Sequence, residues 1–492
     1  EGNISKEKEE RMYLILSSFA LPNFNPLLKD AGIILQGTIS GNTSVANIYD
    51  KPVFGSNLNV QNMILNSEEI GSGPVVCIYD RERDMINING KLTKKEGDNI
   101  KFSGDYFPSR DTNSIAMETE IHNFHLNFFE PFLKGDFTNL KGNASAMLKI
   151  GGTPKNPLIN GTIHTNLKNI RINYLGTDYH FSGDVLVEPS YFDFTNISIY
   201  DANQNKADII SGKLFHNNFR NLQFDVDLSA NKFLFLNTTE KDNPDYYGKV
   251  FATGVVNIFG FLDNNINFSV AAKTDKIKNA SNKNEYSQLF VPLAGYEDVS
   301  ENNFITFVKN DTGKIKTKKY KVNTTGITLN MKTELTSDAH VQFIFDEKVG
   351  DVIKGYGTGN FEMIVNEFGN FKMFGDYTIE NGDYLFTLKN VINKKFRIEN
   401  GGTIYCTGDL ENAEIKMNTV YELRTTLSPL FPDDSTSIYK KRLPVNCVIN
   451  MSGKLMEPDI NFDIDIPTAD NFIKQQVQER LRNSDNEMNR QM

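Results

Sequence analysis

The sequence has 492 residues but no tryptophan and only three cysteines, Cys77, Cys406 and Cys447, which lie far apart and form no Cys-x-x-Cys pair. Three isolated thiols exclude a disulfide framework and a zinc site built on thiolates, and leave room for one bridge at most. The six histidines are also few. His122 and His125 are three positions apart, and on a strand this spacing places them on opposite faces, which makes a poor metal pair. We therefore expect no metal site and no cofactor.

The sequence also lacks a long apolar run and an excess of basic residues. Its longest apolar runs, at 13–16 and 233–236, are far shorter than the roughly 20 residues that span a bilayer as a helix. The 52 basic and 62 acidic residues give a net charge of −10, which argues against a nucleic-acid partner. The chain starts at Glu1 and has no signal peptide, so we interpret it as a segment of a larger polypeptide whose membrane anchor lies outside it.

Motifs of catalysis are missing as well. The sequence has no P-loop, no Gly-x-Ser-x-Gly, no His-Glu-x-x-His and no EF-hand loop. The Gly-Tyr-Gly-Thr-Gly run at 355–359 lacks the third spacing of a dinucleotide fingerprint. Asp225 with Asp227, and Asp463 with Asp465, share a face as paired catalytic carboxylates would, but each pair is the polar side of an amphipathic strand. We interpret the chain as a non-enzyme.

What the sequence does contain is typical of a long, turn-rich β protein. It has 36 Phe and 19 Tyr, which favour strands, and 35 Gly and 16 Pro, which favour turns. Apolar and polar residues alternate with period two in most segments between 33 and 467, and this pattern predicts strands with one dry and one wet face. We expect these apolar positions to line the interior: Phe224, Val226, Leu228, Ile266, Phe268, Val270, Val445, Cys447, Ile449, Met451, Ile460, Phe462, Ile464 and Ile466.

Helical periodicity is confined to the ends. A helix is predicted over residues 5–20, stopped by Pro22 and Pro26. A second is predicted over 469–482, with one apolar stripe formed by Phe472, Ile473, Val477 and Leu481. The Lys- and Asn-rich stretch 273–321 interrupts the alternation, and we interpret it as a surface insertion with a short strand at 304–308.

A strand-turn-strand unit recurs along the chain. A strand ends at glycine, a short turn of Pro, Asn or Asp follows, and a new alternating strand begins, as at 152–161, 260–266, 408–415 and 453–460. Asn-Gly pairs at 89–90, 160–161, 381–382 and 400–401 predict further hairpin turns. Such repetition favours an extended array over a closed globule. Periodicity leaves open whether the apolar face is buried against itself or forms a groove that meets acyl chains.

The C-terminal third carries a recognisable series of motifs. Residues 371–386 read Phe-Lys-Met-Phe-Gly-Asp-Tyr-Thr-Ile-Glu-Asn-Gly-Asp-Tyr-Leu-Phe, and 421–427 read Tyr-Glu-Leu-Arg-Thr-Thr-Leu. Residues 453–467 read Gly-Lys-Leu-Met-Glu-Pro-Asp-Ile-Asn-Phe-Asp-Ile-Asp-Ile-Pro, and 487–491 read Glu-Met-Asn-Arg-Gln. In order and spacing this series resembles the C-terminal domain of the TamB family, the translocation and assembly module proteins, in the form found in Bacteroidetes.

The resemblance implies a fold and a role. It implies an all-β, elongated and repetitive half-pipe (a β-taco groove) of the AsmA-like lipid-transport group, with short terminal helices. It also implies a periplasmic bridge between inner and outer membranes that shields phospholipid in a hydrophobic groove and supports outer-membrane biogenesis. The implied partner is an outer-membrane barrel of the TamA/BamA class, and the implied function needs no cofactor. We expect a helical segment at 1–30, a β groove at 31–272, the insertion at 273–321, a TamB-type β domain at 322–467 and an amphipathic helix at 468–492.

Two other functions fit the same sequence. The chain could be a chaperone-like scaffold that offers strand edges to outer-membrane proteins and works with the same class of barrel. It could also be a structural β-solenoid whose core is filled by its own side chains.

Overall fold

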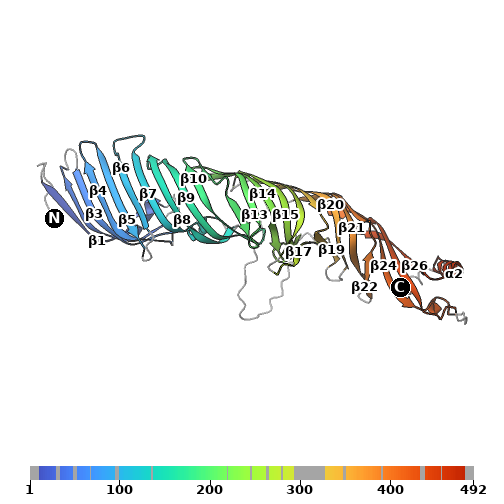
Figure 1. Cartoon of the computed structure of the whole chain (residues 1–492). Helices are drawn as coiled ribbons and strands as arrows, with labels where there is room; N and C mark the ends of the chain where they lie inside the picture. Colours follow the sequence, from blue (N-terminus) through green and yellow to red (C-terminus); the bar gives the residue numbers. More distant parts are fainter. Residues whose placement is uncertain are drawn as a thin grey trace, which may run out of the picture. The chain divides into compact units, whose positions relative to one another are not determined.

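The computed structural model is dominated by strands (Figure 1). It describes residues 10–28, 34–47, 53–66, 68–94, 99–133, 137–218, 220–243, 246–261, 265–278, 281–292, 327–346, 351–368, 370–388, 392–432, 438–455 and 457–482. The strands are β1 (Arg11–Ala20), β2 (Leu35–Ala46), β3 (Val53–Leu65), β4 (Glu68–Asp80), β5 (Met85–Thr93), β6 (Asn99–Tyr106), β7 (Ile115–His125), β8 (Phe137–Gly152), β9 (Pro157–Ile172), β10 (Thr177–Glu188), β11 (Tyr191–Asp193), β12 (Ser198–Asp201), β13 (Lys206–Asn217), β14 (Arg220–Thr238), β15 (Tyr247–Phe261), β16 (Ile266–Lys278), β17 (Asn284–Pro292), β18 (Ile327–Leu335), β19 (Ala339–Asp346), β20 (Asp351–Val365), β21 (Phe371–Leu388), β22 (Ile392–Ile398), β23 (Gly402–Gly408), β24 (Glu414–Thr425), β25 (Leu443–Lys454) and β26 (Glu457–Asp465).

These strands belong to one 26-stranded sheet, so the prediction of an all-β fold built on one repetitive sheet is confirmed. The helical elements of the described residues are short: η1 (Leu21–Phe24), α1 (Asn25–Leu28), η3 (Leu126–Leu133), η4 (Leu410–Asn412), η5 (Ser428–Leu430) and α2 (Asn471–Arg482). The chain divides into two compact units, unit 1 (residues 1–173, 177–229 and 257–266) and unit 2 (residues 174–176, 230–256 and 267–492).

Unit 1 contains an antiparallel meander. From β1 to β10, each strand pairs with the next one along the chain. The short strands β11 and β12 then lie between β10 and β13. The predicted turn at 152–157 joins β8 to β9, as Gly152 pairs with Pro157. Antiparallel neighbours can be joined by such short turns, which is why the turn unit recurs in the sequence.

Unit 2 has its own strand order. β18 and β19 both pair with β20, which pairs with β21. β22 and β23 lie side by side between β21 and β24, and β25 and β26 complete the series. The pairing of β17 with β19 is parallel, whereas the other strand pairs named here are antiparallel. The predicted turns at 408–415 and 453–460 join β23 to β24 and β25 to β26.

The predicted helix over residues 5–20 is wrong where the structure describes it, because residues 11–20 form β1. Arg11 to Leu16 pair with Ala46 to Gly41 of β2. The consecutive apolar residues at 13–16 leave no polar stripe at helical spacing, and the edge of β2 supplies backbone partners that the local sequence does not reveal. A 3₁₀ turn, η1, follows at Leu21 and Pro22, and Leu21 is buried.

The insertion predicted at 273–321 is wrong over its first part. β16 continues to Lys278, and β17 occupies Asn284–Pro292 within the sheet, where Ser287 pairs with Ala339. Lysine and asparagine were not evidence of a loop here, because they occupy the wet face of strands. The strand predicted at 304–308 lies outside the described residues.

The C-terminal helix is confirmed as α2. Asp470 precedes the helix, and its Oδ1 accepts a hydrogen bond from the backbone N–H of Ile473 at 2.9 Å, which is an N-cap. Ile473 and Val477 are buried, at 8% and 1% exposure. Phe472 is 64% exposed, so its assignment to the apolar stripe is wrong. The Leu481 side chain lies outside the described residues.

Candidate functional site: the inner face of the sheet

Cross-strand register places the apolar residues of unit 1 on one face, which we call the inner face. Residues directly opposite one another in an antiparallel pair present their side chains on the same side of the sheet. One inner-face row consists of Cys77, Ile88, Gly104, Met117, Ile150 and Ile159. A second consists of Leu92, Ile100, Ile121, Ala146, Ile163 and Val185. The rows show that alternation along each strand adds up to a continuous apolar surface.

The opposite, outer face is largely polar, although it also carries exposed apolar side chains such as Ile78 and Met147. One outer-face row consists of Asn57, Val76, Asn89, Ser103, Glu118, Lys149 and Asn160. Ion pairs cross the strands on this face, with Lys149 Nζ 3.5 Å from Glu118 Oε1 and Lys101 Nζ 3.0 Å from Glu120 Oε2. Such exposed pairs add little stability. These charged groups instead allow the outer face to be hydrated where they lie.

The inner face of β4 to β10 is incompletely covered. Ile88, Met117, Ile150 and Ile163 are all only partly buried, although Leu92 and Ala146 of the same rows are buried, at 5% and 6% exposure. A closed protein interior is packed as densely as an organic crystal and leaves its side chains almost no exposure. These large apolar side chains therefore still offer surface to an apolar molecule.

Glycines shape this face from within the strands. Gly90 faces Phe102 across β5 and β6, and a Cβ atom at Gly90 would lie 2.3 Å from the Phe102 ring. The hairpin turns predicted at Asn-Gly pairs 89–90, 160–161 and 381–382 are therefore wrong, since these pairs lie inside β5, β9 and β21. The pair at 400–401 is a turn as predicted, with Gly401 at φ +96°. Asn-Gly suits tight turns, but in a strand its glycine can make room for a ring opposite.

The residues predicted to line the interior occupy three settings. Phe224, Val226 and Leu228 pack with Ile197 and Ile209 in one cluster of unit 1. On β16, Ile266, Phe268 and Val270 are partly buried, and they alternate with exposed residues at 265, 267 and 269. The other eight lie in or against two densely buried clusters of unit 2: Val445, Cys447, Ile449, Met451, Ile460, Phe462, Ile464 and Ile466.

A polar cluster that the sequence did not indicate interrupts the inner face at one end of β4, β5 and β7. The Glu68 side chain is 8% exposed, and its Oε1 lies 2.6 Å from Lys94 Nζ and 3.1 Å from His125 Nδ1. Its three members are separated by 26 and 57 positions in sequence, so no local motif announces it. A buried carboxylate needs such compensation by charge and hydrogen bonds. His122, by contrast, contacts Glu120.

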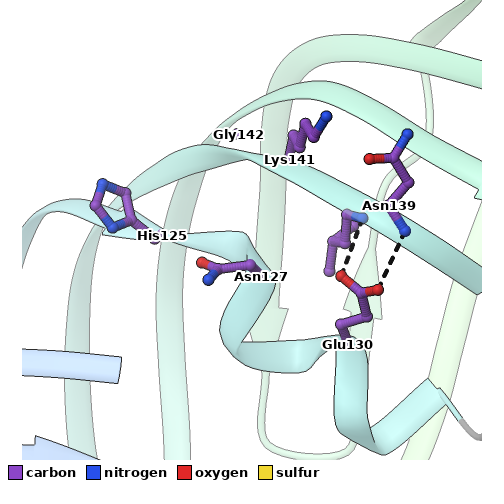
Figure 2. Close-up of a pocket in the computed structure, with 7 residues that line it drawn as sticks. His125, Asn127, Glu130, Asn139, Lys141 and Gly142 are labelled. Atoms are coloured by element: carbon purple, nitrogen blue, oxygen red, sulfur yellow. Dashed lines mark hydrogen bonds between the residues drawn. The ribbon is translucent and has the colours of Figure 1, made fainter. Parts of the chain in front are cut away.

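A shallow cavity of about 450 Å³ lies beside His125, between η3 and β8 (Figure 2). Its polar residues include Asn127, Glu130 and Asn139. The Glu130 carboxylate accepts hydrogen bonds from the backbone N–H groups of Asn139 and Leu140, at 3.2 and 3.3 Å. These bonds occupy Glu130 in holding η3 against the start of β8. Among the described residues, no group of three or more His, Cys, Asp or Glu side chains is arranged to hold a metal ion.

The three thiols are free and differ in setting. Cys77 belongs to an inner-face row and is partly buried, whereas Cys406 and Cys447 are buried in unit 2. Burial disfavours the thiolate, and it raises the pKa of Cys406 to about 11 and raises the pKa of Cys447 in the same direction. The two core thiols are therefore packing residues without nucleophilic character.

Comparison with known families gives one result. The model of the TamB C-terminal domain matches residues 195–487, which is more than half of the chain. Comparison with curated proteins and with solved structures gives no match. No helix among the described residues has both the length and the apolar character needed to cross a bilayer. With its single sheet, apolar inner face and this match, the chain belongs to the TamB C-terminal domain family, a periplasmic, membrane-associated and non-enzymatic family that acts in translocation and assembly or in lipid transport.

Proposed function

We propose that the inner face shields phospholipid acyl chains as they pass between the inner and outer membranes, and that the chain thereby supports outer-membrane biogenesis. The observation that carries this proposal is the incomplete cover over the large apolar side chains of the inner-face rows. Removal of one methylene from water is favourable by about 0.8 kcal/mol. Removal of a 16-carbon acyl chain from water is therefore favourable by on the order of 10 kcal/mol. No bond is broken, and no catalytic group or cofactor is needed.

The dimensions of the meander suit this cargo. Neighbouring strands lie about 4.8 Å apart, so an extended acyl chain of about 20 Å lying across them would cover about four strands. The ten consecutive strands β1 to β10 exceed that length. The polar outer face meanwhile keeps the chain soluble in an aqueous compartment.

A pair of photo-crosslinkers tests the assignment of faces. Ile150 and Lys149 are neighbours on β8, the first partly buried on the inner face and the second exposed on the outer face. A crosslinker at Ile150 should capture lipid in cells and one at Lys149 should not, because adjacent strand residues point to opposite faces. Equal lipid capture at both positions would contradict the proposed inner face.

The second proposed role concerns the carboxyl end, which we propose contacts an outer-membrane barrel of the TamA/BamA class. Among the described strands β26 pairs only with β25, so its other edge carries backbone groups without a strand partner. Such an edge is a template for strand addition, either by a barrel or by an unfolded outer-membrane protein held in a chaperone-like manner.

Cysteine pairs, with one cysteine on β26 and the other in the barrel protein, test this contact. Asp459, Asn461 and Asp463 are exposed on β26, and cysteines there should crosslink in cells to the barrel seam or to the periplasmic domains of the partner. The core thiols Cys406 and Cys447 are buried and should not compete. Crosslinks to the barrel formed only from residues 1–60 would reverse the proposed polarity.

A further inference from the structure

We infer that phospholipid binds the inner face of unit 1 and does not enter the C-terminal core, which we define as the two buried clusters between residues 335 and 477. The inference rests on the function proposed above and narrows it, because it assigns cargo contact to one part of the chain. It also removes from the cargo path the eight residues between Val445 and Ile466, on and just after β25 and β26, that sequence patterning places on an interior face.

The first argument is burial. In the larger cluster, Ile379, Ile404 and Ile449 are 0% exposed and Tyr377 is 1% exposed. By contrast, Met117 and Ile150 on the inner face of unit 1 are only partly buried. At protein packing density an interior has no voids of the size of an acyl methylene. The C-terminal core is thus already filled by the chain's own side chains.

The second argument is that opposite walls of this core touch. Phe386 of β21 and Phe462 of β26 have ring centroids 6.1 Å apart. In the sheet, however, β22, β24 and β25 lie between those two strands. The sheet of unit 2 must therefore curl so that side chains on its apolar face pack against one another. In unit 1 the stacked pair Phe54–Tyr79, at 5.7 Å, joins two adjacent strands, β3 and β4.

The third argument is that side chains cap the C-terminal core near α2. Val477 of α2 is 1% exposed and packs with Leu427 and Tyr439. Tyr439 in turn stacks on Phe431 with ring centroids 4.2 Å apart. Among the described residues, these apolar groups are thus already packed against protein.

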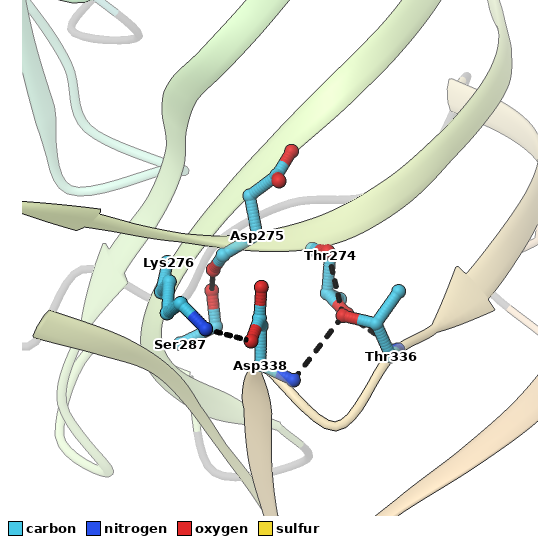
Figure 3. A network of polar contacts seen from close by, with 6 residues as sticks. All are labelled: Thr274, Asp275, Lys276, Ser287, Thr336 and Asp338. Atoms are coloured by element: carbon cyan, nitrogen blue, oxygen red, sulfur yellow. Dashed lines mark hydrogen bonds and ion pairs between the residues drawn. The ribbon is translucent and has the colours of Figure 1, made fainter. Parts of the chain in front are cut away.

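Hydrogen bonds fasten the turn between β18 and β19, next to Leu335 of the same core (Figure 3). The Thr336 backbone N–H donates to Thr274 Oγ1 at 2.9 Å, and Lys276 Nζ lies 2.6 Å from Asp338 Oδ1. Ser287, which is 1% exposed, donates from its hydroxyl to the Asp275 carbonyl at 2.7 Å. Buried polar groups are costly to separate from their partners, so this network opposes entry of an apolar chain.

A photo-reactive methionine analogue tests the inference in one experiment, because methionines sample both regions. The analogue is close in size to methionine, so the core tolerates it as a volume-conserving change. Met63 and Met117 are partly buried in unit 1, while Met417 and Met451 are each 2% exposed in the C-terminal core. Met147, 68% exposed on the outer face, is the matched control for unspecific labelling.

After illumination in cells and mass spectrometry of peptides, lipid adducts at Met63 and Met117 should exceed those at Met417, Met451 and Met147 by at least about tenfold, since a close-packed core excludes lipid. Adducts at Met417 or Met451 as frequent as at Met117 would overturn the inference and leave the proposed function standing. Absence of adducts at Met63 and Met117 would overturn the proposed function, and the inference with it. Equal labelling at Met147 and Met117 would also overturn the inference.

Discussion

We expect the substitution Phe102→Arg to reduce the phospholipid that co-purifies with the protein by at least about tenfold, because it places an unpaired charge in an apolar path. Phe102 is partly buried on the inner face, and its ring lies against Gly90. The two strand neighbours directly opposite Phe102, Gly90 and Thr119, offer the added charge no carboxylate. The measurement is quantitative lipid mass spectrometry on equal amounts of purified protein.

The matched control is Ser103→Arg on the same strand. Ser103 is exposed on the outer face, opposite Asn89 and Glu118. We expect this variant to retain wild-type lipid, because an added arginine on that face meets water and a carboxylate. Circular dichroism and denaturant unfolding must show that both variants keep the β fold. Equal lipid loss in both folded variants, or none in either, would contradict the assignment of faces.

We expect Ile404→Ala to destabilise unit 2 by about 2–5 kcal/mol, as measured by equilibrium denaturant unfolding. Ile404 is 0% exposed, and its strand neighbours Tyr377 and Ile415 are equally well buried. Removal of its side chain leaves a cavity that these rigid neighbours cannot fill. The expected lipid content is unchanged as long as the protein is folded, because this residue lies in the C-terminal core and outside the proposed cargo path.

The adjacent Tyr405 supplies the control for that experiment. Tyr405 is 51% exposed on the other face of β23, and Tyr405→Ala should change the free energy of unfolding by about 1 kcal/mol or less. An unchanged unfolding curve for Ile404→Ala would contradict a filled core. Loss of lipid in folded Ile404→Ala, with wild-type lipid in Tyr405→Ala, would indicate that the core does contact cargo.

The sequence predicted the class of fold because one local signal, period-two alternation, repeats along most of the chain. The same signal placed Val445, Cys447, Ile449 and Met451 on one face of β25, where they are buried at 9% exposure or less. The capped helix α2 was also visible locally, from its apolar spacing. These features depend on residues that are neighbours in sequence, and that is why they could be read from it.

What the sequence did not show depends on distant partners. Residues 11–20 form a strand because β2 offers an edge, and the Glu68, Lys94 and His125 cluster combines three strands. Alternation also cannot tell what covers an apolar face. The partly buried Ile150 and the fully buried Ile449 follow the same pattern. What differs is that strands distant in sequence, such as β21 and β26, meet over the C-terminal core that contains Ile449. Open and closed regions therefore look alike in sequence.

The central claim is that the inner face holds lipid. It is tested most directly by lipid mass spectrometry of the wild-type protein after purification from cells without detergent. We predict that phospholipid co-purifies in a reproducible molar ratio and is released on unfolding, because the partly buried inner-face rows shelter acyl chains from water. Protein that is folded by circular dichroism and carries no phospholipid would contradict the claim and favour a structural β-solenoid.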